Sequence, residues 1–339
     1  MSIPTTTVPQ LFSGSLRPFP GIPEDWSETK QFKASLILQD VRESFPEMLT
    51  EIDPDADVED FWEDAARLSA AWLATGGNLV AKEPGTHNHP WSEDEMSRRL
   101  GTVARSEEGG YHGVDKLIGH AIVQNHGGRG MLRGSIGGDP ATDVVTWLAS
   151  RHRDHGVKRG IVKTTATKTG IWSIELDSDP AVVSERLMDA MDWTYIRLEE
   201  LPGAVFAQDE LELQYEYRLF VVDGLVVSGA GCIEEFTPLD HKPFQAFDTR
   251  LRRVRGHLNQ GEPSPVEDLP EITEQLIRFG QSVAQEFGGT VVIDVAMDAV
   301  ADMPVVIELN NISNSGLYAS DPWLVAEDLV FANDRGYLL

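Results

Sequence analysis

Apolar residues recur at helical spacing in five stretches of the chain. The clearest stretch is Glu271 to Phe287, where apolar side chains fall on one stripe and Gly288 supplies a helix stop. Two other helices are marked by their starts, because Asp179 and Asp321 each precede a proline that suits the first helical position. The pattern predicts helices over 60–75, over 143–155, from Pro180, over 271–287 and from Pro322.

Runs of β-prone residues lie between these helices and predict strands. Asp223 and Gly224 separate two such runs, which predicts a tight hairpin. The segment GIVKTTATKTGIWSIEL, residues 160–176, predicts two strands joined by a loop with two lysines. This mixture of helices and strands predicts an α+β protein, and the residues up to about Asp25 are expected to form an extended arm.

Two predicted strands near the end of the chain carry polar residues among apolar ones. Asp294 faces away from the apolar residues beside it, and Glu308 and Asn310 share one face of the second strand. If AVADM connects the two strands symmetrically, Asp294 lies directly opposite Glu308, where like charges repel. Two carboxylates and an amide oxygen suit magnesium, whose other ligands are typically phosphate and water. The pattern therefore favours a magnesium–nucleotide site over the alternative of a solvated acidic face.

The overall charge narrows the range of partners. The 339-residue chain has 55 Asp and Glu against 28 Lys and Arg, a formal net charge of -27, which repels phosphate backbones and anionic lipid. Neither nucleic acid nor membrane is expected as a partner. Cys232 is the single cysteine, which excludes an intrachain disulfide and a cysteine-rich zinc site. With no export signal pattern and no run of about 18 apolar residues, a cytoplasmic protein is expected.

Two further clusters of residues leave alternatives open. Arg250 and Arg253 lie in DTRLRRVRG, which is either a capture site for an anionic substrate or a solvated basic loop. His87 and His89 lie in THNHPW, but a three-letter match with no third ligand at a recognisable spacing is weak support for a nuclease or a zinc site.

From about Gly160 to Asp321 the chain resembles the ATP-grasp family. That family has a metal-binding Asp on one strand and a Glu-x-Asn on the return strand, which Asp294, Glu308 and Asn310 match in order. A polar loop follows in both, here Asn311 to Gly316. The family also places one lysine at the end of a central strand and often a second near a phosphate loop. Lys163 and Lys168 match those positions, although TTATKTG has fewer glycines than many such loops.

The resemblance implies further site residues and an organisation of the chain. It implies ATP with magnesium, or manganese in its place, and Gln208 and Asp209 near adenine, with Glu216 on the ribose. Arg218 and Lys168 would then act on the transferring phosphoryl group. The expected domains are a variable N-terminal region over 1–140, a central subdomain over 141–204 and a C-terminal subdomain over 205–339. The residues expected to bind substrate are Asn311, Ser313, Asn314, Ser315, Arg250 and Arg253.

The expected reaction is ATP-dependent ligation of a carboxylate to an amine through an acyl-phosphate. The substrates are expected to be small molecules or peptides. Two alternatives stay open: a kinase on the same scaffold that phosphorylates an alcohol, and a nucleotide-binding interaction protein without catalysis.

Overall fold

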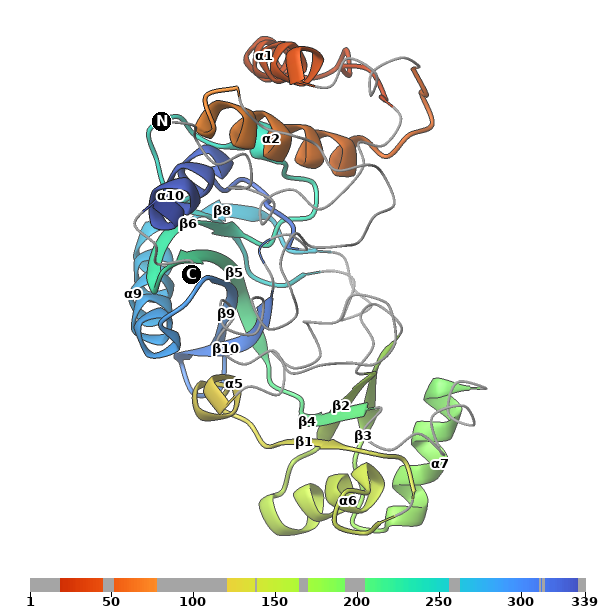
Figure 1. The fold of residues 1–339 in the computed structure, drawn as a ribbon. Coiled ribbons are helices and arrows are strands. Elements are labelled where there is room, and N and C mark those ends of the chain that lie inside the picture. Colours follow the sequence, from red (N-terminus) through yellow and green to blue (C-terminus); the bar gives the residue numbers. More distant parts are fainter. Residues whose placement is uncertain are drawn as a thin grey trace. The chain divides into compact units, whose positions relative to one another are not determined.

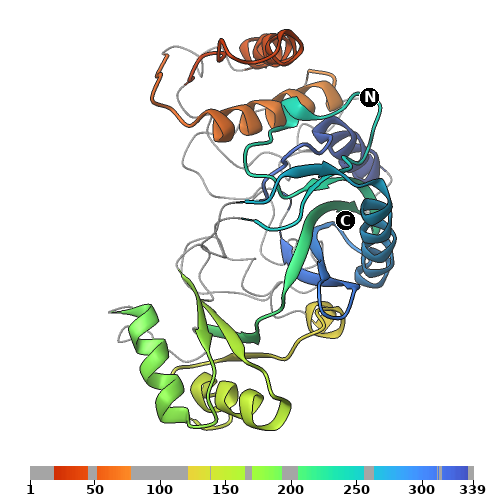
Figure 2. The same cartoon turned by 180° about the vertical axis from the view of Figure 1, so that it is seen from behind.

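The computed structural model describes residues 19–44, 52–77, 121–137, 139–164, 170–192, 205–255, 263–310, 312 and 315–334. Its contacts divide the chain into two compact units. The first unit contains Met1–Val103, Leu213–Met297 and Asn310–Leu339, and the second contains Ala104–Glu212 and Asp298–Leu309. Figures 1 and 2 show the chain from opposite sides. Its helices and antiparallel hairpins give the α+β class that the sequence predicts.

The second unit contains a four-stranded antiparallel sheet in the order β1-β4-β2-β3. Its strands are β1 (Met131–Gly134), β2 (Arg159–Thr164), β3 (Ile171–Glu175) and β4 (Val205–Asp209). Two helices, α6 (Val144–His155) and α7 (Pro180–Met191), pack on this sheet around a core that includes Leu148, Val162 and Leu187. A short helix, α5 (Ala121–His126), precedes β1.

Aspartates cap both helices of this sheet. The Asp179 carboxylate accepts a hydrogen bond from the Ala181 N–H ahead of α7, as predicted, and the Asp143 carboxylate accepts from the N–H groups of Val145 and Thr146 in α6. Gly156 ends α6 in the left-handed conformation that glycine adopts readily.

The first unit is built on β5 (Leu213–Val222) and β6 (Leu225–Gly231), which form a hairpin. Asp223 and Gly224 both have positive φ, as a tight two-residue turn requires, so the predicted hairpin is confirmed. The strands β9 (Val291–Asp298) and β10 (Met303–Asn310) belong to the same sheet, in the order β10-β9-β5-β6.

Helices cover both faces of this hairpin. Helix α9 (Pro270–Phe287) packs closely on one face, where a Cβ on Gly280 would lie 2.0 Å from Leu219. On the other face, α10 (Pro322–Asp334) and α2 (Val58–Ala74) enclose Phe220 in one apolar cluster. The predicted helices over 271–287 and from Pro322 are therefore confirmed.

The N-terminal part of the first unit differs most from the prediction. Helix α2 begins at Val58, capped by Asp57, about two residues before the predicted start. Helix α1 (Glu28–Ser44) was not predicted, and it packs on α2 through Ile37, Leu38 and Val41. The remaining elements of this unit are η2 (Pro238–Asp240) and the strand pair β7 (Arg250–Arg252) and β8 (Val266–Asp268). Among the described helices, none is both long and apolar enough to cross a membrane.

Candidate functional site

Arg218 on β5 and Asp294 on β9 form a buried, two-pronged ion pair. Arg218 Nε donates to Asp294 Oδ1 and Nη2 donates to Oδ2, both at 2.7 Å. Asn310 Nδ2 donates to the same Oδ2 at 3.0 Å. The Asp294 residue is 0% exposed, so the alternative that it lies on a solvated acidic face is wrong. Three predicted site residues thus meet in one network of the first unit.

Arg218 also holds the segment that follows β10. Its Nη1 donates to the backbone carbonyl of Gly316 at 3.1 Å, and its guanidinium lies 5.2 Å from the centre of the Tyr318 ring. Burial alone would lower the pKa of Arg218, but Asp294 holds that pKa well above its ordinary value. Arg218 therefore keeps its positive charge across the physiological pH range.

The side chains of Asp294, Glu308 and Asn310 have the chemistry of magnesium ligands, but Asp294 already has other partners. Asp294, Glu308 and Asn310 all offer oxygen, the donor that magnesium prefers. Arg218 and Asn310 already donate three hydrogen bonds to the Asp294 carboxylate. In the part of the chain that the structure describes, no three His, Cys, Asp or Glu side chains form a metal-binding group. A metal here would therefore share Asp294 with Arg218.

Glu308 belongs to the second unit, where it faces Lys163 at the end of β2. Lys163 Nζ lies 3.8 Å from Glu308 Oε2, with side chains 17% and 26% exposed. Nearby, Arg129 donates to the backbone carbonyls of Val306 at 2.8 Å and Ile307 at 2.6 Å. Burial lowers the pKa of Arg129 to about 10, against the opposing effect of Glu308. The strand that carries Glu308 is thus held by a partly buried arginine, and Glu308 itself is also partly exposed.

The two predicted adenine residues lie at the end of β4. Gln208 and Asp209 are both buried, and Gln208 lies between Met131 of β1 and Ile161 of β2 in the sheet register. Arg151 donates to Asp209 through Nε at 2.9 Å and Nη2 at 2.6 Å. The Asp209 carboxylate therefore forms a two-pronged ion pair with Arg151.

The remaining candidates in the first unit are paired with side chains of opposite charge or with an amide. Glu216 accepts from Arg255 at 2.8 Å, and Arg250 is held by Asp248 through Nε at 2.9 Å. The Arg253 guanidinium lies 3.2 Å from the side-chain amide of Gln214. In the segment DTRLRRVRG, Arg250 and Arg255 are thus held in ion pairs. The alternative of a solvated basic loop does not hold for these two arginines.

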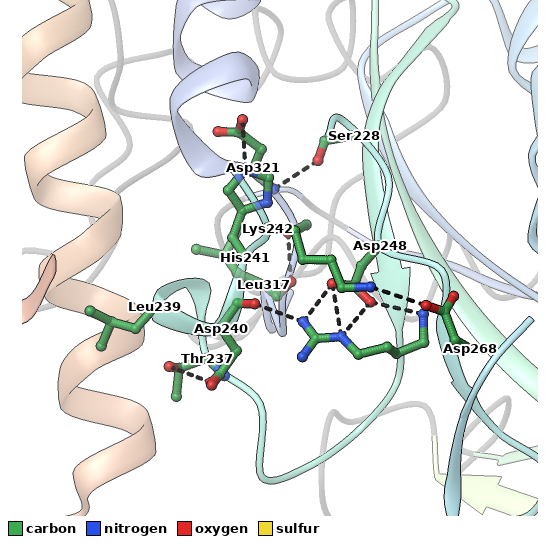
Figure 3. Close-up of polar contacts among 12 residues, drawn as sticks. Ser228, Thr237, Leu239, Asp240, His241, Lys242, Asp248, Asp268, Leu317 and Asp321 are labelled. Atoms are coloured by element: carbon green, nitrogen blue, oxygen red, sulfur yellow. Dashed lines mark hydrogen bonds and ion pairs between the residues drawn. The ribbon is translucent and has the colours of Figure 1, made fainter. Parts of the chain in front are cut away.

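Arg250 takes part in a second polar network of the first unit, whose residues Asp240, His241, Asp248 and Asp321 are labelled in Figure 3. Its Nη2 donates to the backbone carbonyl of Asp240 at 2.7 Å, while His241 Nε2 lies 3.2 Å from Asp321 Oδ2. The Asp321 backbone N–H donates to Ser228 Oγ at 2.8 Å. This network joins the segment after β6 to the start of α10.

Several predicted residues lie outside the described part of the chain, namely Lys168, Asn311, Ser313, Asn314, His87 and His89. Ser315 is described: it is buried, and its backbone carbonyl accepts a hydrogen bond from Arg67 of α2. Sequence reasoning missed Arg67, which is 4% exposed. The sequence does contain a sign of its role, because Arg67 stands between Ala66 and Leu68 in the apolar stripe of a helix. An arginine buried at such a position requires polar partners.

Comparison with known proteins gives a result for solved structures only. No family model matches the chain, and no curated protein matches it. The chain is similar in structure to several solved enzymes. These are ATP-grasp ligases.

The d-alanine–d-alanine ligase from Coxiella burnetii is 11% identical, with a TM-score of 0.38, and the match covers 64% of this chain and 56% of that one. The ATP-grasp ligase PsnB with minimal precursor, Mg and ADP is 16% identical, with a TM-score of 0.33 and coverage of 66% and 59%. This chain thus spans less than two thirds of either ligase. For the d-alanine–d-alanine ligase from Bacillus anthracis complexed with ATP, the identity is 10%, the TM-score 0.40 and the coverage 93% and 95%. At such values no residue role is transferred from these ATP-grasp ligases to this chain.

Proposed function

We propose that the chain is an ATP-dependent ligase of the ATP-grasp type that joins a carboxylate to an amine through an acyl-phosphate. The observation that carries the proposal is the buried Arg218, which is held by Asp294 and reaches the polar segment after β10. A permanently charged, fixed guanidinium suits phosphoryl transfer, which depends on positioning and electrostatics more than on covalent chemistry from the protein.

Each residue proposed to bind the nucleotide has its own role. Lys163, which is partly exposed at the end of β2, supplies a flexible positive charge for the phosphates, and Lys168 is proposed for the same purpose. The strand β4, with Gln208 and Asp209, receives the adenine through its backbone, and Glu216 is proposed for the ribose. Asp294, Glu308 and Asn310 would hold magnesium, or manganese, which when bound would offset the negative charge of the phosphates.

The proposed reaction has two steps, and the bonds balance in each. A carboxylate oxygen of the first substrate attacks the γ-phosphorus of ATP, the bond to the bridging oxygen breaks, and ADP leaves with that electron pair. Arg218 and Lys163 offset the charge on the transferring group. The amine of the second substrate then attacks the acyl carbon, phosphate leaves, and the amine gives up a proton to solvent.

The test is capture of the acyl-phosphate with hydroxylamine. The chain is incubated with magnesium, ATP and pooled carboxylates, and the proposal predicts a hydroxamate together with ADP and free phosphate. A phosphorylated product without free phosphate would instead support the kinase. If no ADP forms with any pool, the chain is not a ligase of this kind. Lys163→Gln should lower the rate, whereas Arg153→Gln, which changes an exposed arginine on α6, serves as the matched control.

A further inference from the structure

Two arginines hold the backbone of the segment that follows β10. Arg67 of α2 donates through Nη1 to the carbonyl oxygen of Ile312 at 3.5 Å and through Nη2 to the carbonyl oxygen of Ser315. Arg218 of β5 donates to the carbonyl oxygen of Gly316 at 3.1 Å. Both arginines are buried. Three carbonyl groups of this short segment are therefore directed at guanidinium groups.

Each arginine also has a carboxylate partner that fixes its side chain. Arg67 Nη2 donates to Glu63 Oε1 at 2.6 Å, one turn away on α2, and Arg218 is paired with Asp294 of β9. A guanidinium that is fixed by a carboxylate presents its other N–H groups in a set direction, because its fork of donors is planar and rigid. The two ion pairs therefore anchor the segment from α2 and from β5.

Apolar contacts reinforce this hold on the segment. Ile312 and Leu317 are buried in one cluster with Ala70 and Ala71 of α2. Tyr318 follows with a φ of +50°, a value that a bulky residue adopts only when its surroundings enforce it. Side-chain packing and the bonds to the carbonyls thus keep the segment in a conformation that it would not adopt alone.

The direction of these carbonyls also sets the direction of the N–H groups in the same peptide units. Among the residues that the structure describes, every peptide bond is trans, and in a planar trans peptide the C=O and N–H bonds point in opposite directions. The carbonyls of Ser315 and Gly316 point to the arginines, so the N–H groups of Gly316 and Leu317 point to the opposite side. Arg67 can therefore control the polar groups on the far side of the segment without touching what they bind.

We propose that Arg67 is a positioning residue for the substrate site, so that helix α2 takes part in the reaction through the backbone of the segment after β10. This inference rests on the proposed function, in which that segment binds substrate. Arg67 itself contacts neither the nucleotide nor the metal in this proposal. Changing Arg67 should therefore impair use of the carboxylate and amine substrates and spare the binding of Mg·ATP.

The test compares Arg67→Lys with Arg42→Lys, which makes the same change at an exposed position of α1. Lysine at position 67 keeps a positive charge beside Glu63, but its single ammonium group replaces the fork that holds two carbonyls. With pools of carboxylates and amines as substrates and ADP release as the readout, Arg67→Lys should lower kcat/KM about tenfold or more, because small displacements of positioning groups have large effects on rate. The Kd for Mg·ATP should stay within about twofold, since the nucleotide is bound elsewhere. Arg42→Lys should change neither quantity.

Two further measurements separate positioning from a role in stability alone. Hydrogen exchange of the amides from Ser315 to Leu317 should be faster in Arg67→Lys than in native protein, and unchanged in Arg42→Lys. A double variant, Arg67→Met with Glu63→Gln, removes the ion pair without leaving an unpaired charge, so it should stay folded. Its turnover should nevertheless be as low as that of Arg67→Lys, because no guanidinium holds the carbonyls.

Three results would count against the proposal. Native turnover in the double variant would overturn the inference. So would equal exchange and equal turnover in Arg67→Lys and Arg42→Lys. Native protein that releases no ADP with any pool would instead remove the proposed ligase, and the substrate role of Arg67 with it.

Discussion

The predicted site residues form two ion pairs that differ in burial and geometry. In the first unit, Arg218 and Asp294 are joined by two hydrogen bonds of 2.7 Å, and Asp294 is fully buried. In the second unit, Lys163 and Glu308 are 3.8 Å apart and both side chains are partly exposed. Removing one partner of a buried pair leaves an uncompensated charge, whereas an exposed pair contributes little to stability. Under the proposed function, the first pair would hold Arg218 in place, and the second pair would exchange its partners for a ligand.

The largest expected effect is from breaking the buried pair. Asp294→Ala should lower the free energy of unfolding by about 3–5 kcal/mol, because it leaves the Arg218 guanidinium buried without its counter-charge. Urea denaturation followed by circular dichroism measures this change. The matched control is Asp154→Ala, which removes an acid from the exposed Arg153–Asp154 pair and should leave the midpoint unchanged.

A double variant shows whether the loss comes from the unpaired charge. Replacing both partners with apolar residues, Arg218→Met with Asp294→Leu, should recover much of the stability, since no charge remains buried. The double variant should still lack ATP-dependent activity, because it has no Arg218 guanidinium. A double variant as unstable as Asp294→Ala would show that the pair is not the source of the destabilisation.

The partly exposed pair should give the opposite result. Lys163→Met should change the free energy of unfolding by less than about 1 kcal/mol, because the two groups are 3.8 Å apart and both are partly in contact with solvent. Its affinity for Mg·ATP should fall about tenfold, equivalent to about 1.4 kcal/mol, measured by calorimetry. A large loss of stability with unchanged affinity would reverse the roles assigned to the two pairs.

A smaller effect is expected at the start of α10. The Asp321 carboxylate accepts hydrogen bonds from the N–H groups of Trp323 and Leu324 at 3.0 and 3.1 Å, so Asp321→Ala should lower the free energy of unfolding by about 1 kcal/mol at pH 7. Burial would raise the pKa of Asp321, but hydrogen bonds from His241 and the backbone hold that pKa below its ordinary value.

The sign of this shift sets the pH dependence. A carboxyl whose folded pKa is lowered stabilises the fold above its unfolded value of about 3.9, and the contribution is lost as the pH falls through the lower folded pKa. The difference between native protein and Asp321→Ala should therefore be full at pH 7 and shrink below about pH 4. A difference that is constant from pH 7 to pH 3 would show that Asp321 acts only by packing.

The smallest effect is expected at Lys242 and Asp268, which lie 3.3 Å apart with side chains 34% and 60% exposed. Lys242→Gln should change the free energy of unfolding by about 0.5 kcal/mol or less, and added salt should erase the difference. A change as large as that of Asp321→Ala would mean that exposure is a poor guide to the strength of ion pairs in this chain.

Local signals in the sequence predicted much of the secondary structure. Caps and turns act within a few residues, so Asp179 and the Asp223–Gly224 pair located a helix start and a hairpin. Helix α1 lacks such a clear signal, because Phe32 and Leu36 are apolar yet 63% and 48% exposed, which blurs its apolar stripe. Where the apolar pattern and the burial pattern diverge, periodicity does not identify the helix.

The site could be predicted only in part, because its partners are distant in the sequence. The alternation of residues identified Asp294 as unusual, but nothing local indicates that Arg218, 76 positions earlier, is its partner. Arg67 lies still further away, and its contact with Ser315 joins segments 248 positions apart. Such pairings are set by tertiary packing, which neither hydrophobic periodicity nor capping residues encode.

The central claim is that this chain binds a magnesium nucleotide through Glu308 and Lys163, and thermal unfolding with and without Mg·ATP tests it most directly. A ligand at a hundred times its dissociation constant adds about 2.7 kcal/mol to the free energy of unfolding, which raises Tm by several degrees. The account predicts this rise for native protein and a much smaller one for Glu308→Ala, with Tm in the absence of ligand nearly equal. An equal rise in both proteins, or none in either, would contradict the assignment of Glu308 to a metal–nucleotide site.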